Sequence, residues 1–205
     1  MAPVSSASLK QRVAREAAAL LYTSQEKEYK QAKQRAAQTL GARVLPSNRE
    51  IAYELDNLAD EMEGSTRQEQ LTRMRHEALH IMTTLKDFQP ILIGSVWRGT
   101  AHKDSDIDIA TFSDQPTKVQ EKLEQEGFEV TKTEWQAAPK LDKGSKSFQI
   151  YLKLSSGDEA EVVVRSLERI SQKVRCEIYG DTVTGLNLKQ LENLLKTNSL
   201  QKFTP

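Results

Sequence analysis

The chain has 205 residues, with 29 Lys and Arg against 29 Asp and Glu, so its formal net charge is zero at pH 7. A neutral chain carries no bulk charge that calls for a nucleic acid or a membrane surface as its partner. The single cysteine, Cys176, excludes an intrachain disulfide bond and a zinc site built on cysteines. The sequence has no apolar run near the ~20 residues of a membrane-spanning helix, and Met1–Ser8 lacks a secretory signal core. We therefore expect a cytoplasmic protein without a membrane partner.

Apolar residues recur at helical spacing through the first part of the chain. We expect a helix from about Leu9 to Leu40, and a break at Thr23–Ser24 that divides it into two helices is the alternative. Basic residues dominate Lys10–Arg49, whereas Glu50–Glu63 contains acids and no base. Neighbouring helices that complement each other explain this pattern, and a basic face that steers RNA is the competing interpretation.

Two capping signals follow. Ser47 and Glu50 form a capping box, which predicts the start of a helix that ends near Gly64. Thr66 and Glu69 repeat the box and predict a third helix, which Pro90 stops. The sequence therefore predicts a helical N-terminal region over residues 1–88.

Two aspartates on a predicted strand are the strongest chemical signal in the sequence. Ile91–Phe112 predicts a short strand, a Gly-Ser turn, a polar loop and a second strand with Asp106 and Asp108. Side chains two apart on a strand share a face, so these carboxylates point together while Ile107 and Ile109 face a core. Neighbouring carboxylates repel each other unless a cation lies between them. The pattern favours a divalent metal such as Mg²⁺, which prefers carboxylate oxygens.

The turn before the polar loop has the features of a phosphate site. Gly94 lets backbone N–H groups approach an anion closely, and the Ser95 hydroxyl is a further donor. A phosphate site opposite metal-binding aspartates is typical of phosphoryl or nucleotidyl transfer.

The fuller motif consists of Gly94–Thr100 (Gly-Ser-x-x-Arg-Gly-Thr) and Ser105–Asp108 (Ser-Asp-Ile-Asp). It resembles the signature of the polymerase-beta-like nucleotidyltransferase superfamily, and especially those of archaeal CCA-adding enzymes and minimal nucleotidyltransferases. The resemblance implies a palm-like mixed sheet and a metal-bound NTP. It also implies that the nucleotide is bound by Gly94, Ser95, Arg98 and Thr100. An ordinary β-turn-β unit with an exposed acidic loop is the competing interpretation.

The superfamily places a third metal-binding carboxylate on a strand next to the Asp-x-Asp strand. Two alternating segments flank the turn Ser156-Gly157-Asp158 and predict a hairpin. On its return strand, Glu161 resembles the third position, and Glu159 on the same face is the alternative. Many relatives have Asp at this place, but the longer Glu side chain can still reach a metal. A plain exposed strand residue is the competing interpretation of Glu161.

His76 and His80 form a His-Glu-x-x-His pattern with Glu77, the signature of zinc proteases, on the third predicted helix. Both histidines share a helix face at i and i+4 and could bind zinc. The only other histidine, His102, lies in the polar loop, and no separate substrate cleft is evident. A polar helix face is the favoured interpretation.

The C-terminal half alternates between strand and helix patterns. A helix is expected over residues 117–127, strands over 128–135 and 147–155, a small hairpin near 174–183, and a last helix capped by Asn187 and Gln190. The lysine-containing loop 137–147 is either solvated or a contact for the triphosphate or acceptor, and the tail 197–205 is expected to fray. The prediction is an α+β fold: a helical N-terminal region (1–88) and a polymerase-beta-like mixed β-sheet nucleotidyltransferase domain (89–205).

The resulting functional hypothesis is a metal-dependent nucleotidyltransferase that releases pyrophosphate from an NTP, with ATP as the expected substrate. Asp106, Asp108 and Glu161 would hold two Mg²⁺ or Mn²⁺ ions and perform the chemistry. The sequence leaves the acceptor open between an RNA 3′ end, a protein hydroxyl and a small molecule, and it does not address the oligomeric state. A non-catalytic nucleotide- or RNA-binding module of the same fold is the second hypothesis.

Overall fold

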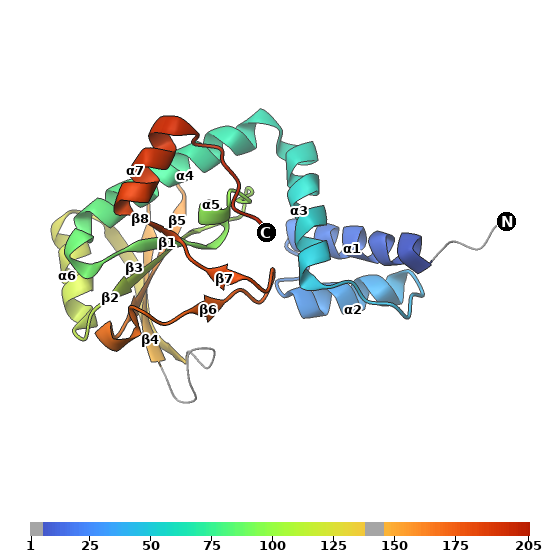
Figure 1. Ribbon diagram of the computed structural model, residues 1–205, viewed down its shortest axis with the longest axis horizontal. Coiled ribbons are helices and arrows are strands. Elements are labelled where there is room, and N and C mark those ends of the chain that lie inside the picture. The colour runs from blue at the N-terminus through green and yellow to red at the C-terminus, as the bar shows by residue number, and fades with distance from the viewer. Residues whose placement is uncertain (1–5, 138–145) are drawn as a thin grey trace. The chain divides into compact units, whose positions relative to one another are not determined.

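The structure, a computed structural model, describes residues 6–137 and 146–205 (Figure 1). It confirms an α+β protein with a mixed sheet. The chain packs into two compact units: one holds residues up to Arg67 with Cys176–Asp181, and the other holds Gln68–Arg175 with Thr182–Pro205. The division into domains at residue 88 stays a prediction. The hypothesised phosphate contact of the lysine-containing loop lies mostly outside the described residues.

The first unit is built on three helices: α1 (Ser6–Tyr22), α2 (Tyr29–Thr39) and α3 (Asn48–Glu63). The alternative of a break at Thr23–Ser24 is confirmed, because Ser24 adopts a φ of +54° and the helix ends before it. Small side chains let these helices pack closely. The core of the unit consists of Val13, Ala14, Ala17, Ala18, Leu20, Ala32, Ala36, Ala37 and Ile51.

Opposite charges pair between helices of this unit. Lys10 on α1 forms an ion pair with Glu50 on α3, with 2.7 Å between Nζ and Oε1. Arg15 reaches two acids of the same helix, Glu54 and Glu61. The complementary arrangement of basic and acidic segments is therefore the interpretation that these contacts support. Each such exposed pair contributes little stability, about 0–1 kcal/mol.

The two predicted capping boxes have different outcomes. Ser47 caps α3, and its side chain and that of Glu50 bind each other's backbone N–H groups as predicted. The prediction of a capping box at Thr66 is wrong, because α4 (Ser65–Thr84) has already begun at that residue. Gly64 ends α3 with a φ of +55°, a conformation that glycine adopts readily. Gly64 is the one residue between α3 and α4, and it has no side chain that could cap α4.

The second unit contains a sheet with the strand order β3-β4-β5-β2-β1-β8. Its strands are β1 (Ile91–Ile93), β2 (Ile107–Phe112), β3 (Glu129–Ala137), β4 (Lys146–Lys153), β5 (Glu159–Arg165) and β8 (Leu186–Asn187). β2 runs parallel to β5 and antiparallel to β1. β3 and β4 form a hairpin at one edge. A second, small sheet pairs β6 (Val174–Arg175) with β7 (Thr182–Val183), as the sequence predicts.

The core lies between one face of the sheet and three helices: α4, α6 (Pro116–Gln125) and α7 (Leu188–Thr197). Alternation along β5 places Ala160, Val162 and Val164 in this core and leaves the intervening residues on the other face. Pro116 begins α6, and Asn187 with Gln190 caps α7, both as predicted. None of the helices in the described part of the chain is long and apolar enough to cross a membrane.

Arg75, a buried residue of α4, holds several backbone segments together. Its guanidinium donates to the carbonyl oxygens of Val96 and Trp97, at 3.1 and 3.0 Å. It also donates to the carbonyls of Ser199 and Gln201 in the C-terminal tail. The expectation of a frayed tail is therefore wrong, because backbone groups of the tail have partners in the interior of the unit. Burial lowers the pKa of Arg75 to about 10, so the side chain is still charged at neutral pH.

We expect Arg75→Met to destabilise the protein by about 3 kcal/mol, because four carbonyl oxygens lose a charged donor while the aliphatic stem keeps its packing. Urea unfolding followed by circular dichroism measures this change. Arg12→Met, at an exposed position of α1, is the control and should change stability by less than about 0.5 kcal/mol. Equal effects of the two substitutions would contradict the role of Arg75.

Candidate active site

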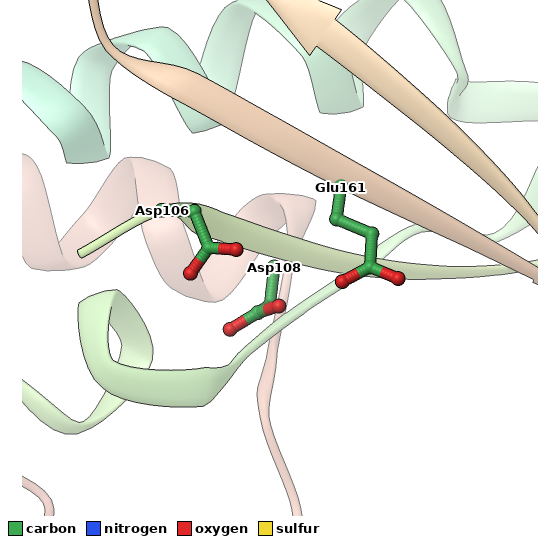
Figure 2. A group of neighbouring side chains, drawn as sticks. All are labelled: Asp106, Asp108 and Glu161. Carbon is green, nitrogen blue, oxygen red and sulfur yellow. The ribbon is translucent and has the colours of Figure 1, made fainter. Parts of the chain in front are cut away.

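Three carboxylates gather on the face of the sheet opposite the core. One oxygen from each of Asp106, Asp108 and Glu161 lies within 4.8 Å of the others, a spacing that can hold a metal ion. Figure 2 shows Glu161 on one strand and Asp108 on its neighbour, with their side chains converging. Of the described residues, this is the only group of three or more His, Cys, Asp or Glu that could do so.

Strand register brings these side chains together. Asp108 on β2 lies directly beside Glu161 on β5, and Asp106 immediately precedes β2. On the opposite face, Ile107 and Ile109 are fully buried, as expected for residues that alternate with the aspartates. Glu159 is not part of the group, so the geometry favours Glu161 as the third carboxylate. Its role in binding metal stays a prediction.

Burial and the crowding of negative charge raise pKa values in the group. Burial, together with the charges of Asp106 and Glu161, raises the pKa of Asp108 to about 8. Burial and the charges of Asp106 and Glu134 raise the pKa of Glu161, and a hydrogen bond from Tyr151 lowers it. A divalent cation among these oxygens would remove the repulsion, and an all-oxygen donor set suits Mg²⁺ or Mn²⁺. The carboxylates therefore fit the predicted metal.

Gly94 comes very close to this group. It follows β1, whose last residue pairs with Asp108. A Cβ atom on Gly94 would lie 1.9 Å from Oδ2 of Asp108, and the φ of Gly94 is +71°. Only glycine fits here, because any side chain would displace the Asp108 carboxylate. The glycine of the motif thus keeps the turn and the carboxylates in contact.

The loop between β1 and β2 has a fixed shape. α5 (Gly94–Arg98) begins with the motif, and the backbone N–H of Thr100 donates to the Ser95 carbonyl at 3.0 Å. Ser105 closes the loop before Asp106, because its hydroxyl accepts from the backbone N–H of His102 at 2.9 Å. Ser95 and Thr100 are partly exposed at the start and end of this turn. Their predicted contact with a nucleotide stays a prediction.

Arg98 contacts the C-terminal tail. Its side chain is 4% exposed and stacks on the Trp97 ring, with its guanidinium carbon 4.4 Å from the ring centre. One guanidinium nitrogen donates to the Phe203 carbonyl at 3.0 Å, and the backbone N–H of Phe203 donates to the Arg98 carbonyl at 2.8 Å. These contacts support a role in shaping the loop, and the predicted binding of phosphate by Arg98 stays a prediction.

The two histidines of the His-Glu-x-x-His pattern are not joined by a third ligand among the described residues. Nδ1 of His76 lies 2.9 Å from the Thr72 carbonyl within the same helix. The His80 ring packs near Phe128, with 5.1 Å between ring centres. Both side chains are exposed on α4, which fits the polar helix face favoured by the sequence.

Arg75 and Tyr151 are not singled out by any sequence motif. Arg75 lies on the apolar face of its helix, four residues after Leu71. A charged residue on an apolar face is the one sequence feature that could have marked Arg75 as a buried structural residue. Tyr151 alternates with buried neighbours on β4, which places it on the polar face. Its position beside Glu161 depends on strand register, which alternation alone does not give.

We expect Gly94→Ala to destabilise the protein more than Gly127→Ala. Both glycines have positive φ, but an added Cβ meets nothing within 4 Å at Gly127. The backbone strain, about 1–2 kcal/mol, is therefore common to both, and the contact with Asp108 adds about 1–3 kcal/mol to Gly94→Ala alone. Urea unfolding measures both costs. Equal destabilisation would mean that the turn has room for a side chain.

The raised pKa of Asp108 predicts how the stability of the metal-free protein, kept in EDTA, depends on pH. The folded-state pKa, about 8, lies above the usual value of 3.8, so the folded state binds more protons between these two pH values. Stability should therefore fall as pH rises from 5 to about 8. Asp108→Asn should flatten this dependence and make the protein more stable than the wild type at pH 8.

Urea unfolding of both proteins at several pH values tests this expectation. Asp87→Asn, which removes an exposed carboxylate outside the group, is the control and should keep the wild-type profile. Parallel profiles for wild type and Asp108→Asn would show that Asp108 titrates in the folded protein as an ordinary carboxylate.

Comparison with known proteins finds a family that is similar to the segment holding this site. Residues 77–170 match the family model of the nucleotidyltransferase domain. This segment contains the Gly94 turn and all three carboxylates. No curated protein matches the chain.

Three solved structures show how far the likeness extends. A cytoplasmic RNA terminal U-transferase is 18% identical over 58% of this chain, with a TM-score of 0.36. Cid1 with the UTP analogue UMPNPP is 20% identical over 60%, with a TM-score of 0.38. The GLD-2/RNP-8 complex is 19% identical over 60% of this chain, with a TM-score of 0.32. This chain covers only 34%, 37% and 39% of those three chains, respectively. The match over residues 77–170 agrees with the resemblance of the Gly-Ser and Asp-x-Asp motifs to those of nucleotidyltransferases.

Proposed function

We propose that this protein is a metal-dependent nucleotidyltransferase that transfers a nucleoside monophosphate from an NTP to an acceptor hydroxyl. The observation that carries the proposal is the convergence of Asp106, Asp108 and Glu161 beside the Gly94 turn. The group lies within the segment that matches the nucleotidyltransferase family. A chain that only needed a stable sheet would gain nothing from three adjacent carboxylates, because their repulsion opposes folding.

The three carboxylates are the residues that would hold Mg²⁺ or Mn²⁺ ions. When bound, two such ions would orient the NTP and stabilise the charge that develops in the transfer. The one exposed member, Asp106, lies at the open side of the group, while Asp108 and Glu161 are partly buried. This difference in exposure leaves room for substrate oxygens on the side of Asp106.

The chain's own residues position the reactants. The backbone N–H groups at Gly94 and the hydroxyl of Ser95 hold the β- and γ-phosphates of the NTP. The acceptor hydroxyl oxygen then forms a bond to the α-phosphorus as the bond to the bridging oxygen breaks, and pyrophosphate leaves with that electron pair. Asp108 or Glu161 accepts the hydroxyl proton.

ATP is the proposed NTP, and the acceptor is an RNA 3′ end, a protein hydroxyl or a small molecule. A nucleotide- or RNA-binding module without catalysis is the second candidate. The carboxylate group separates the two hypotheses, because a module that only binds needs no acidic cluster to hold phosphates. The second candidate predicts nucleotide binding without label transfer.

The test is transfer of label from each of the four α-labelled NTPs with Mg²⁺ or Mn²⁺. The reactions contain the protein alone, total RNA or a mixture of small hydroxyl compounds, so that the labelled product identifies the acceptor class. We expect labelled product and pyrophosphate in equal amounts. Asp106→Asn, Asp108→Asn and Glu161→Gln should each reduce the rate on the order of a hundredfold or more, because each removes a ligand of the metal ions that would stabilise the transition-state charge.

Asp104→Asn is the matched control. Asp104 lies two residues from Asp106, is exposed and forms an ion pair with Lys103 outside the group. Its substitution should leave transfer within about twofold of wild type. Transfer that survives in the three carboxylate variants would disprove the catalytic assignment, and NTP binding without transfer in the wild type would favour the binding module.

A further inference from the structure

Arg165, the last residue of β5, carries a positive charge that the rest of the chain does not neutralise. Its side chain is half-buried, and its Nε–H group is buried without a hydrogen-bond acceptor. Within the described part of the chain, no acidic side chain pairs with Arg165. Burial and the like charge of Arg169 lower the pKa of its guanidinium. A charge that is partly removed from water normally has a counter-ion, because its desolvation costs free energy. Arg165 therefore calls for an anion from outside the chain.

Strand alternation places Arg165 on the same face of the sheet as the carboxylates. Glu161 and Arg165 are four residues apart on β5, and Val162 and Val164 between them enter the core on the opposite face. Four residues of a strand span about 13 Å. An anion at Arg165 would thus share the face of the candidate active site and lie apart from its metal-binding oxygens.

Strand β4 supplies a second donor beside Arg165. Ser147 and Arg165 each lie one residue beyond the pair Phe148–Val164, so the antiparallel ladder sets them side by side. Ser147 is 4% exposed, and its Oγ accepts from Nε2 of Gln149 at 3.2 Å. Its own proton has no acceptor among the residues that the structure describes. A guanidinium beside a hydroxyl offers several N–H and O–H groups to one anion, which suits the oxygens of a phosphate group.

Gln149 also has an unpartnered group at this place. Its side chain is 6% exposed, and its Oε1 atom is buried without a hydrogen-bond donor. Buried polar groups without partners are rare in folded proteins, and they commonly mark places where a water, an ion or a ligand binds. Two of them, on neighbouring strands and on the same face, indicate a binding position.

The triphosphate of the NTP does not account for this position. Ile93 pairs with Asp108, and β1 runs antiparallel to β2, so Gly94 leaves the sheet in the direction away from Phe112. Phe112 is the strand partner of Arg165. A triphosphate at the Gly94 turn and an anion at Arg165 would therefore lie on opposite sides of Asp108. The second reactant, the acceptor, is left as the source of that anion.

We propose that Arg165 and Ser147 form a subsite for a phosphate group of the acceptor. The inference deepens the proposed function: it rests on that function for the identity of the ligand as an acceptor, but not for the binding of phosphate. An acceptor with this chemistry carries a phosphate as well as the hydroxyl that attacks. It is the end of a polynucleotide or a small phosphorylated compound, whereas a neutral small molecule lacks the group that Arg165 binds.

The test measures binding to the full chain in EDTA, so that it requires neither metal nor transfer. One probe is a short fluorescein-labelled RNA, followed by its anisotropy, and the other is inorganic phosphate, followed by the shift of the urea unfolding midpoint. Arg165→Met should weaken binding about tenfold, because a charged donor to phosphate is lost. Ser147→Ala should weaken it about threefold, because a neutral donor is lost. For RNA, Arg165→Met should also reduce the slope of log affinity against log salt by about 0.7, the share of one phosphate contact.

Lys153→Met is the matched control. It removes the same charge from an exposed position at the other end of β4 and should leave binding within about twofold of wild type. Without phosphate, Arg165→Met should unfold at no lower urea concentration than wild type, because it removes a half-buried charge that has no partner. Loss of binding without loss of stability separates a ligand-binding role from a structural one. In transfer assays, Arg165→Met should raise KM for the acceptor and leave KM for the NTP unchanged.

The two probes distinguish the two sources of phosphate. Loss of RNA binding in Arg165→Met would identify a polynucleotide, and loss of binding to inorganic phosphate alone would identify a small phosphorylated acceptor. Equal binding of both probes by wild type and Arg165→Met, or no binding of either by the wild type, would overturn the subsite. A wild type that binds a probe through Arg165 but transfers no label would overturn the proposed function instead and leave the subsite in place.

Discussion

The parallel pairing of β2 with β5 sets Asp108 beside Glu161, and the candidate site depends on that register. The opposite face of the same strands fixes it, because Ile107, Ile109 and Val162 are fully buried there and each contributes about 1.5–3 kcal/mol. A slip of one residue would move these side chains to the polar face. Keeping Asp108 charged at pH 8 or above opposes folding by on the order of 5 kcal/mol, which is a similar magnitude. The core therefore holds the carboxylates together against their repulsion, and a divalent cation would relieve it.

Buried arginines secure the turn that faces these carboxylates. Arg75 binds carbonyl oxygens at the end of α5, and Arg98 within α5 binds the backbone of the tail. Gly99 makes this contact possible, because a Cβ there would lie 2.7 Å from the Gln201 carbonyl. The Arg-Gly pair of the motif thus packs against the tail that follows α7. The tail contacts α5, the helix that begins with Gly94, and it does not contribute to the carboxylate group.

Features encoded by neighbouring residues could be predicted from the sequence. The capping box at Ser47 and the alternation along β5 each depend on residues a few positions apart, and both are present in the structure. The Asp-x-Asp pair was predictable for the same reason. The start of α4 was not, because the sharp turn at Gly64 overrides the cap signal of Thr66. Nor could the sequence show that Arg75 binds the tail, since the partners are more than a hundred residues apart and are backbone carbonyls, which every residue has.

The mixed pairing of β2 gives the candidate site two distinct flanks. On the antiparallel side, β1 ends at Ile93 opposite Asp108 and delivers the Gly94 turn. On the parallel side, β5 contributes Glu161, and β4 and β3 extend the same row through Tyr151 and Lys132. Under the proposed function, the first flank would hold the triphosphate. Asp108 lies between the two flanks, so a single carboxylate joins the phosphate turn on β1 to the row of polar side chains on β5, β4 and β3.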